Sequence, residues 1–103
     1  MANVSSRIVL GSDLNHHGTL FAGQMAKWVV EACLIEVVRL HGRADDLVCV
    51  NIQELTFQRS VANGVIVTID TFVERLGETS LTIGARAFGG SSSALVLETA
   101  ITF

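Results

Sequence analysis

The sequence predicts an α+β domain in which one long helix lies across a five-stranded antiparallel sheet. Residues 21–40 are apolar at fourteen of twenty positions and contain no proline, as expected for a long helix. Three later segments alternate apolar and polar residues and are joined by short glycine-containing turns, which favours an antiparallel meander. A helix packed on one face of a sheet buries the apolar surface of both. The 103 residues fit a single domain, which we place at residues 1–103.

The first part of the chain predicts a strand, a loop and the helix. Residues 4–10 form a short apolar segment. The polar residues 11–19 that follow contain two glycines, an aspartate, an asparagine and two histidines, which favour a loop. The helix is expected to end near His41, because Gly42 suits the left-handed residue that follows a helix. Apolar residues occupy nearly every side of this helix, so we expect it to be buried.

The rest of the chain predicts four strands. Residues 48–57 alternate, but their apolar positions change parity near Glu54, which predicts a bulge at that point. The turns of the meander are expected at residues 76–78 and 89–92, where glycines occur. Its three strands are expected at residues 65–73, 81–87 and 95–103.

The composition excludes several classes of protein. With 50% hydrophobic and 17% charged residues, the chain does not have the composition of a disordered protein. The net charge of -3 and the scattered Lys and Arg residues argue against nucleic-acid binding. No 18-residue run lacks polar groups, which argues against a membrane span, and no secretory leader pattern is present, so we expect a cytoplasmic protein. High apolar content in so short a chain predicts that a partner subunit covers part of the surface.

Neither the cysteines nor the histidines predict a metal or redox centre. Cys33 and Cys49 do not form a Cys-x-x-Cys pair, and we expect two buried, reduced thiols. His16 and His17 are adjacent, and neighbouring residues rarely point at one ion, so we expect no metal. No cofactor is expected.

The start of the helix is the best candidate for a chemical site. Free backbone N–H groups at the positive end of a helix suit an anion or a developing oxyanion. Gly23 would let a substrate carbonyl approach this backbone closely. The alternative is an ordinary helix start that is packed by Phe21.

Three segments carry a resemblance to a known family. Residues 15–23, NHHGTLFAG, lead into the helix and resemble the signature N-x-x-G-x-x-F-[GA]-G of hotdog-fold acyl-CoA thioesterases. Residues 57–64, FQRSVANG, resemble the family's F-x-x-P-V-x-x-G segment, with Ser60 in place of the proline. Residues 75–81, RLGETSL, resemble its V-G-x-[ST]-S hairpin. The matches follow the family's order along the chain.

The resemblance implies a fold, an assembly and an activity. The helix would be wrapped by the sheet, and two subunits would join into a ten-stranded sheet, as a homodimer or within a higher homo-oligomer. The sites would lie at subunit interfaces and hydrolyse acyl-CoA to a carboxylic acid and CoA. By position, the Gly23 amide would bind the thioester oxygen, and Asn15 would position water or substrate. We therefore expect an enzyme.

The expected catalytic carboxylate is where this sequence departs from the family. The family acid usually follows the second glycine by seven residues, and that position is Val30. Glu31 is the candidate base, but it lies roughly 80° from Gly23 around the helix, whereas Val30 lies roughly 20° away. Glu31 has an alternative partner in Lys27, one turn earlier. The missing acid favours a second interpretation, a non-catalytic acyl-CoA-binding module; a purely structural oligomer is the third.

Further residues are candidates for contact with CoA. Each has an ordinary alternative as a solvent-facing loop or hairpin residue, and Trp28 is expected in the core or at a dimer contact. The candidate substrate-binding residues are His16, His17, Arg59, Arg75, Thr79 and Ser80.

Overall fold

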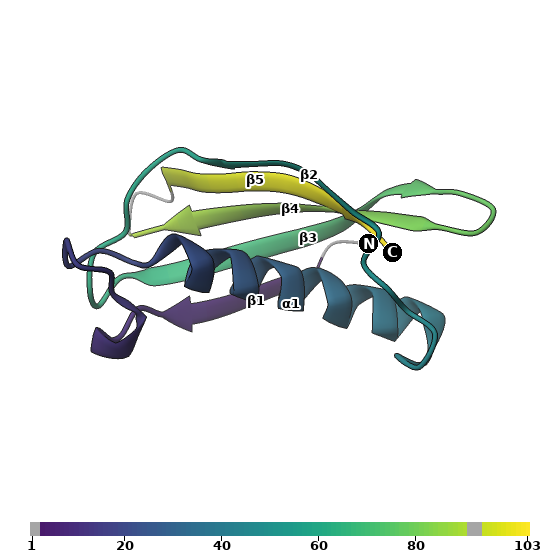
Figure 1. Ribbon diagram of the computed structural model, residues 1–103, viewed down its shortest axis with the longest axis horizontal. Helices are drawn as coiled ribbons and strands as arrows, with labels where there is room; N and C mark the ends of the chain where they lie inside the picture. Colours follow the sequence, from purple (N-terminus) through teal and green to yellow (C-terminus); the bar gives the residue numbers. More distant parts are fainter. Residues whose placement is uncertain (1–2, 91–93) are drawn as a thin grey trace.

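The predicted α+β architecture is confirmed by a computed structural model, which describes residues 3–90 and 94–103. One helix lies along one face of a curved sheet (Figure 1). The elements, in chain order, are β1 (Asn3–Ile8), the 3-10 helix η1 (Gly11–Asp13), α1 (Ala22–His41), β2 (Asn51–Phe57), β3 (Ile66–Leu76), β4 (Leu81–Gly89) and β5 (Ala94–Thr102).

All neighbouring strands are antiparallel, in the order β1-β3-β4-β5-β2. The predicted meander is β3, β4 and β5, and the Gly77 N–H donates to the Ser80 carbonyl in its first turn. In the second predicted turn, Gly90 has a φ of 78°, whereas Ser91 and Ser92 lie outside the described residues. The order leaves β1 at one edge of the sheet and β2 at the other.

Helix α1 ends as predicted but is not buried on every side. Gly42 adopts a φ of 100°, and its N–H donates to the Val38 carbonyl. Trp28 is 4% exposed and packs in the core with Met25 and other apolar residues, which confirms its predicted place. The expectation of a fully buried helix is wrong for this single chain: the sheet covers only one face. Exposed apolar side chains on α1 and just before it are Phe21, Ile35 and Leu40.

Strand β2 contains the predicted bulge and is exposed along most of its length. Its pairing with β5 shifts register between Gln53 and Thr56, on either side of Glu54. The strand begins at Asn51 rather than at the predicted residue 48. Because β2 pairs only with β5 and no described segment covers it, its other edge is free within this chain. Ile52 and Phe57 are among its exposed apolar side chains.

The two thiols have different surroundings. Cys33 is buried in the core, whereas Cys49 is exposed, so the prediction of two buried thiols is wrong for Cys49. Burial raises the pKa of the Cys33 thiol to about 12, and the nearby Cys49 and Glu36 groups add to the shift. Cys49 is exposed because the segment before β2 has no second layer of chain over it.

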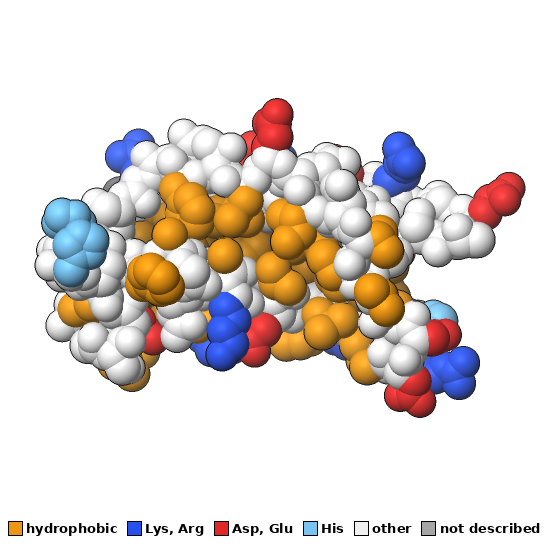
Figure 2. Space-filling view, in the orientation of Figure 1, with side chains coloured by type: hydrophobic (Ala, Val, Ile, Leu, Met, Phe, Trp, Pro, Cys, Tyr) orange, Lys and Arg blue, Asp and Glu red, His pale blue; other side chains and the backbone are white. Residues whose placement is uncertain are grey.

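Figure 2 shows apolar side chains gathered on the helix-covered face of the molecule. We call this surface the apolar strip and define it by Phe21, Ile35 and Leu40 together with Val48, Val50, Ile52 and Phe57. Single exposed apolar residues are ordinary, but a contiguous set of this kind marks an interaction surface. Among the described helices, none is long and apolar enough to cross a membrane.

Candidate functional site

The loop between β1 and α1 is built around the side chain of Asn15. The Asn15 Oδ1 atom accepts hydrogen bonds from the N–H of His17 at 2.9 Å and the N–H of Thr19 at 3.1 Å. It also accepts the Thr19 hydroxyl at 3.3 Å. Gly18 supplies the left-handed residue of this turn, with a φ of 78°. The loop therefore holds the Asn15 side chain in one orientation.

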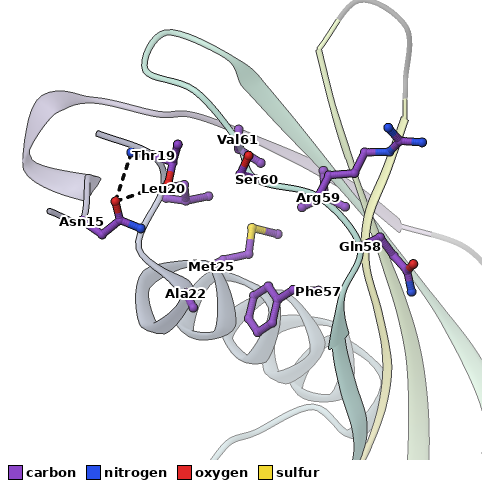
Figure 3. A pocket seen from close by; sticks show the side chains of 11 residues that line it. Asn15, Thr19, Leu20, Ala22, Met25, Phe57, Gln58, Arg59, Ser60 and Val61 are labelled. Atoms are coloured by element: carbon purple, nitrogen blue, oxygen red, sulfur yellow. Dashed lines mark hydrogen bonds between the residues drawn. The ribbon is translucent and has the colours of Figure 1, made fainter. Parts of the chain in front are cut away.

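These bonds decide which atom of the Asn15 amide faces the neighbouring cavity. Oδ1 is occupied by three donors, so the free atom is Nδ2, which can only donate. Figure 3 shows this nitrogen turned away from the dashed bonds to Thr19 and toward the cavity. Asn15 can therefore donate to a carbonyl or water oxygen, but it is not arranged to accept a proton.

The first turn of α1 also presents donors. The Phe21 carbonyl accepts from the N–H of Gln24 at 3.0 Å and of Met25 at 3.1 Å. The N–H groups of Ala22 and Gly23 have no acceptor among the described residues. Unpaired N–H groups at this end of a helix attract carbonyl oxygens and anions. Asn15 and Ala22 line the same cavity, so donors from the loop and the helix face one space.

The ring of Phe21 leaves no room for a side chain at residue 23. A Cβ added at residue 23 would lie 2.6 Å from Cε2 of the Phe21 ring, closer than two such atoms approach. The alternative given in the sequence analysis, a helix start that is packed by Phe21, is therefore confirmed for the Cα atom of Gly23. It does not exclude the predicted role of the amide, because the ring covers Cα while the N–H lacks an acceptor.

The cavity beside Asn15 has a volume of about 380 Å³ and lies between the start of α1 and the segment after β2. Met25 and Phe57 form part of its apolar wall (Figure 3). Arg59 lines it as well, but its guanidinium extends away from the centre of the cavity. None of the described residues that line the cavity is acidic. This chain alone therefore brings donors to the cavity but no carboxylate base.

Glu31 lies on the other side of α1. Its carboxylate is 3.9 Å from the guanidinium of Arg7 on β1, the edge strand opposite β2. The prediction that Glu31 pairs with Lys27 is wrong. Glu31 pairs with Arg7 instead, because the sheet brings β1 beside this face of the helix. Val30, at the usual position of the family acid, packs against the apolar core. Glu31 is thus not brought together with Asn15, and Gly23 borders a separate hollow beside the Asn15 cavity.

The predicted loop residues lie at the same end of the molecule as the cavity. His16 and His17 are exposed, with ring centroids 3.9 Å apart. His17 helps to shape the turn through its main-chain N–H rather than through its ring. Both rings are exposed but neither lines the cavity, whereas Arg59 is exposed and lines it.

The predicted hairpin residues lie at the opposite end. Thr79 and Ser80 line a cleft of about 600 Å³ between the β3–β4 turn and the carboxyl end of α1, and Arg75 is exposed on the same hairpin. A helix of 20 residues is about 30 Å long, so a single chain does not bring Thr79 and Ser80 to Asn15. Leu40, Leu47, Leu76 and Phe103 make much of this cleft apolar.

Sequence reasoning gave no role to Asp13 or to Gln24. Asp13 Oδ1 accepts the Gln24 side-chain amide at 2.8 Å, although the two residues are eleven positions apart. The available signal was the short spacing from Asp13 to Asn15 in a loop that leads into the helix. Among the described residues, no group of three or more His, Cys, Asp or Glu side chains could hold a metal ion.

Solved structures share this fold. An acyl-CoA hydrolase from Staphylococcus aureus, solved with butyryl-CoA and CoA, matches 98% of this chain at 21% identity and a TM-score of 0.87. This chain spans 60% of that protein's length. A hexameric thioesterase from Yersinia pestis matches 95% of this chain and 81% of its own, at 20% identity and a TM-score of 0.89. A hypothetical thioesterase from Streptococcus pneumoniae, solved with CoA, matches 98% of this chain and 77% of its own, at 17% identity and a TM-score of 0.87.

These likenesses confirm the predicted hotdog fold, in which the sheet wraps around the helix. No curated protein sequence matches the chain. The family model for the thioesterase superfamily matches residues 17–102, beginning two residues after Asn15. That match covers most of the chain, including the helix, the segment after β2 and the hairpin. The chain therefore belongs to the thioesterase superfamily.

Proposed function

We propose that this protein hydrolyses acyl-CoA thioesters to a carboxylic acid and CoA. The observation that carries the proposal is a pair of donors at one cavity, the unpaired N–H of Ala22 and the free Nδ2 of Asn15. Gly23, whose N–H also has no acceptor among the described residues, follows Ala22 in the helix and borders the neighbouring hollow. The thioester oxygen would accept from the helix amides, which stabilise the negative charge that develops when water attacks the carbonyl carbon. The C–S bond then breaks, and the thiolate of CoA leaves and takes up a proton.

The base that removes a proton from water is the least supported part of the proposal. Glu31 remains the candidate, although it must leave Arg7, 3.9 Å away, to serve a site. The absence of an acidic residue from the described cavity lining favours a second candidate function, an acyl-CoA-binding module that does not turn its ligand over. Val30 at the position of the usual acid favours the same function.

The proposal includes a homo-oligomer. The apolar strip runs beside the free edge of β2, where a second copy could continue the sheet. The chain exposes 6186 Å², whereas a monomer of 11.0 kDa exposes about 5600 Å² by the usual scaling. The similar thioesterase from Yersinia pestis is a hexamer. In such an assembly, Arg75, Thr79 and Ser80 would contact CoA from a second subunit, while His16, His17 and Arg59 would contact it from the first.

The proposed compartment is the cytoplasm. Free thiols at Cys33 and Cys49 are compatible with the reducing conditions there. Localisation of a tagged full-length protein tests this point.

A hydrolysis screen separates the two candidate functions. Loss of thioester absorbance is measured for acyl-CoA from acetyl to palmitoyl, and CoA binding is measured by calorimetry. Turnover that saturates with substrate supports the hydrolase, and binding without turnover supports the module. Absence of both excludes acyl-CoA as the ligand.

Val30→Asp sharpens the screen, because it restores a carboxylate close to the direction of Gly23. A general base contributes roughly 100- to 10,000-fold, so we expect at least a tenfold gain in turnover. Glu31→Gln is the matched variant: a large fall in wild-type turnover, with folding unchanged, makes Glu31 the base. Unchanged turnover removes it from the mechanism.

A further inference from the structure

Asp13 is a buried acidic residue to which the proposed reaction gives no role. It is 9% exposed and ends η1, two residues before Asn15. Its Oδ2 atom accepts the Leu10 N–H at 2.9 Å, and its Oδ1 atom accepts the Gln24 side-chain amide at 2.8 Å. Its main-chain carbonyl accepts the Phe21 N–H at 2.8 Å. One residue therefore ties together three points of the chain.

Two of these points enclose the unpaired amides. Phe21 comes directly before Ala22 and Gly23, and Gln24 comes directly after them. The third point, Leu10, lies just past the end of β1. Asp13 thus connects the end of an edge strand to both sides of the two residues whose N–H groups lack acceptors. If the two side-chain bonds were lost, the main-chain bond from Phe21 would remain, but the first turn of α1 would lose its links to the Gln24 side chain and to Leu10.

Asp13 does not face the cavity beside Asn15. It lines a separate hollow of about 400 Å³, together with Phe21, Gly23 and Gln24, and it is absent from the lining of the Asn15 cavity. A carboxylate that faced the thioester would repel the developing oxyanion. Of the two residues with unpaired amides, Gly23 borders the hollow of Asp13 and Ala22 borders the Asn15 cavity, so Asp13 reaches that cavity only through the groups that it holds.

We propose that Asp13 is the positioning residue of this site, which holds the Ala22 and Gly23 amides in the orientation that binds a thioester carbonyl oxygen. This inference rests on the proposed function. It makes a distinction that a purely structural role does not: binding of a ligand with a carbonyl on the group attached to sulfur depends on Asp13, whereas binding of CoA, which lacks that carbonyl, does not.

The charge state of Asp13 agrees with this role. The hydrogen bond from Gln24 lowers the pKa of the Asp13 carboxyl, and the Leu10 N–H and the nearby Arg7 charge lower it further. The ionised form, which accepts on both oxygens, is therefore the form present near neutral pH. A negative charge beside the first turn also stabilises the positive end of α1.

Two variants test the inference. Asp13→Ala removes both side-chain acceptors. Asp13→Asn is the conservative variant. Its Oδ1 can still accept from the Leu10 N–H. Its Nδ2 can donate to the side-chain oxygen of Gln24 once the Gln24 side-chain amide has flipped. Asp46→Asn is the matched control, since Asp46 pairs with His41 at the other end of α1.

The ligand measurement uses acetonyl-CoA, a thioether ketone that has a carbonyl group but no scissile thioester, and CoA as its reference. Asp13→Ala is expected to weaken acetonyl-CoA binding by roughly 3- to 10-fold, the effect of one hydrogen bond, and to leave CoA binding unchanged. Asp13→Asn should recover most of the loss. Equal weakening of both ligands, or none, overturns the proposal.

Backbone relaxation of the amides at residues 21–24 provides a readout that needs no ligand. In Asp13→Ala their order parameters should fall from about 0.85 to below about 0.6, and Asp46→Asn should leave them unchanged. Unchanged order in a folded Asp13→Ala protein overturns the positioning role. If the wild type binds neither ligand, the proposed function fails, and the relaxation data still decide the role of Asp13.

Discussion

The two ends of α1 differ in what they offer a ligand. At the amino end, the unpaired N–H of Ala22 and the Asn15 amide border a cavity of about 380 Å³. At the carboxyl end, the cleft of about 600 Å³ is lined largely by apolar side chains, and His41 pairs with Asp46 at 2.9 Å on its rim. The larger hollow is therefore not the better candidate for the chemistry.

Under the proposed function, unpaired donors rather than volume decide which end takes a carbonyl group. The amino end holds donors that the fold leaves unpaired, whereas the carboxyl end satisfies its last turn through Gly42. A carbonyl oxygen would meet unpaired N–H donors at the first end and mainly apolar side chains at the second. Four predictions test whether the carbonyl group binds at the amino end of α1 rather than at its carboxyl end. They run from the largest expected effect to the smallest.

Gly23→Val should cause the largest loss. A side chain at residue 23 obstructs the amide, and losing one such donor costs about 100- to 1,000-fold in turnover. The measurement is the steady-state rate of acyl-CoA hydrolysis, or acetonyl-CoA binding if the wild type is inactive.

Phe21 supplies the control for this variant. A new Cβ also strikes the Phe21 ring, so Phe21→Ala combined with Gly23→Val removes the collision but keeps the obstruction. The double variant should stay inactive. Recovery in the double variant would mean that Gly23 matters only for packing.

Asn15→Asp should cost about 100-fold in turnover. Aspartate keeps an oxygen that can accept from His17 and Thr19, so the loop is retained, but it replaces the Nδ2 donor with a second acceptor. Thermal melting checks that the loop and fold survive. Turnover close to that of the wild type would show that this amide does not contact the substrate.

Variants at the hairpin should have a smaller and different effect. Replacing Thr79 and Ser80 together by alanine is expected to raise KM by about threefold with little change in kcat, since peripheral polar contacts each contribute modestly. The comparison variant is Glu98→Gln on the outer face of the sheet, where Glu98 pairs with Arg86 at 2.8 Å. A fall in kcat as large as that of Asn15→Asp would place the chemistry at the carboxyl end of α1 and contradict the comparison.

The smallest effect concerns stability in acid. The pKa of Asp13 is below its ordinary value of 3.8, so the ionised carboxylate adds stability above that pH. The contribution is lost as pH falls through the lowered pKa of the folded state. Asp13→Asn should therefore be less stable than the wild type at pH 7, and the two should converge below about pH 4. Urea unfolding at several pH values measures the difference, and a constant gap contradicts the argument.

The fold could be predicted because its signals are local. The apolar run of residues 21–40, the glycine after it and the alternating segments were sufficient for one helix and a meander. The parity change near Glu54 even located the bulge of β2. The exposure of Cys49 and of one helix face could not be predicted, because it depends on which surfaces the rest of the chain leaves uncovered.

The site was predictable only in part, for the same reason. Asn15 and the helix start are close in sequence, so a motif could identify them together. The partner of Glu31 is Arg7, 24 residues away, and only the position of β1 beside the helix brings them together. Likewise, Thr79 and Ser80 match the family's hairpin, but nothing in their sequence showed that they lie a helix length from Asn15.

The order of the strands has a consequence for how the chain folds. The β3–β5 meander joins neighbours through short turns, whereas β1 must find β3 and β2 must find β5 across much of the chain. Closing long loops slows folding, so the meander is expected to form early and the two edge strands late. The cavity beside Asn15 is enclosed by the loop after β1 and the segment after β2. A newly synthesised chain is therefore expected to complete the Asn15 cavity last, when both edges have joined the sheet.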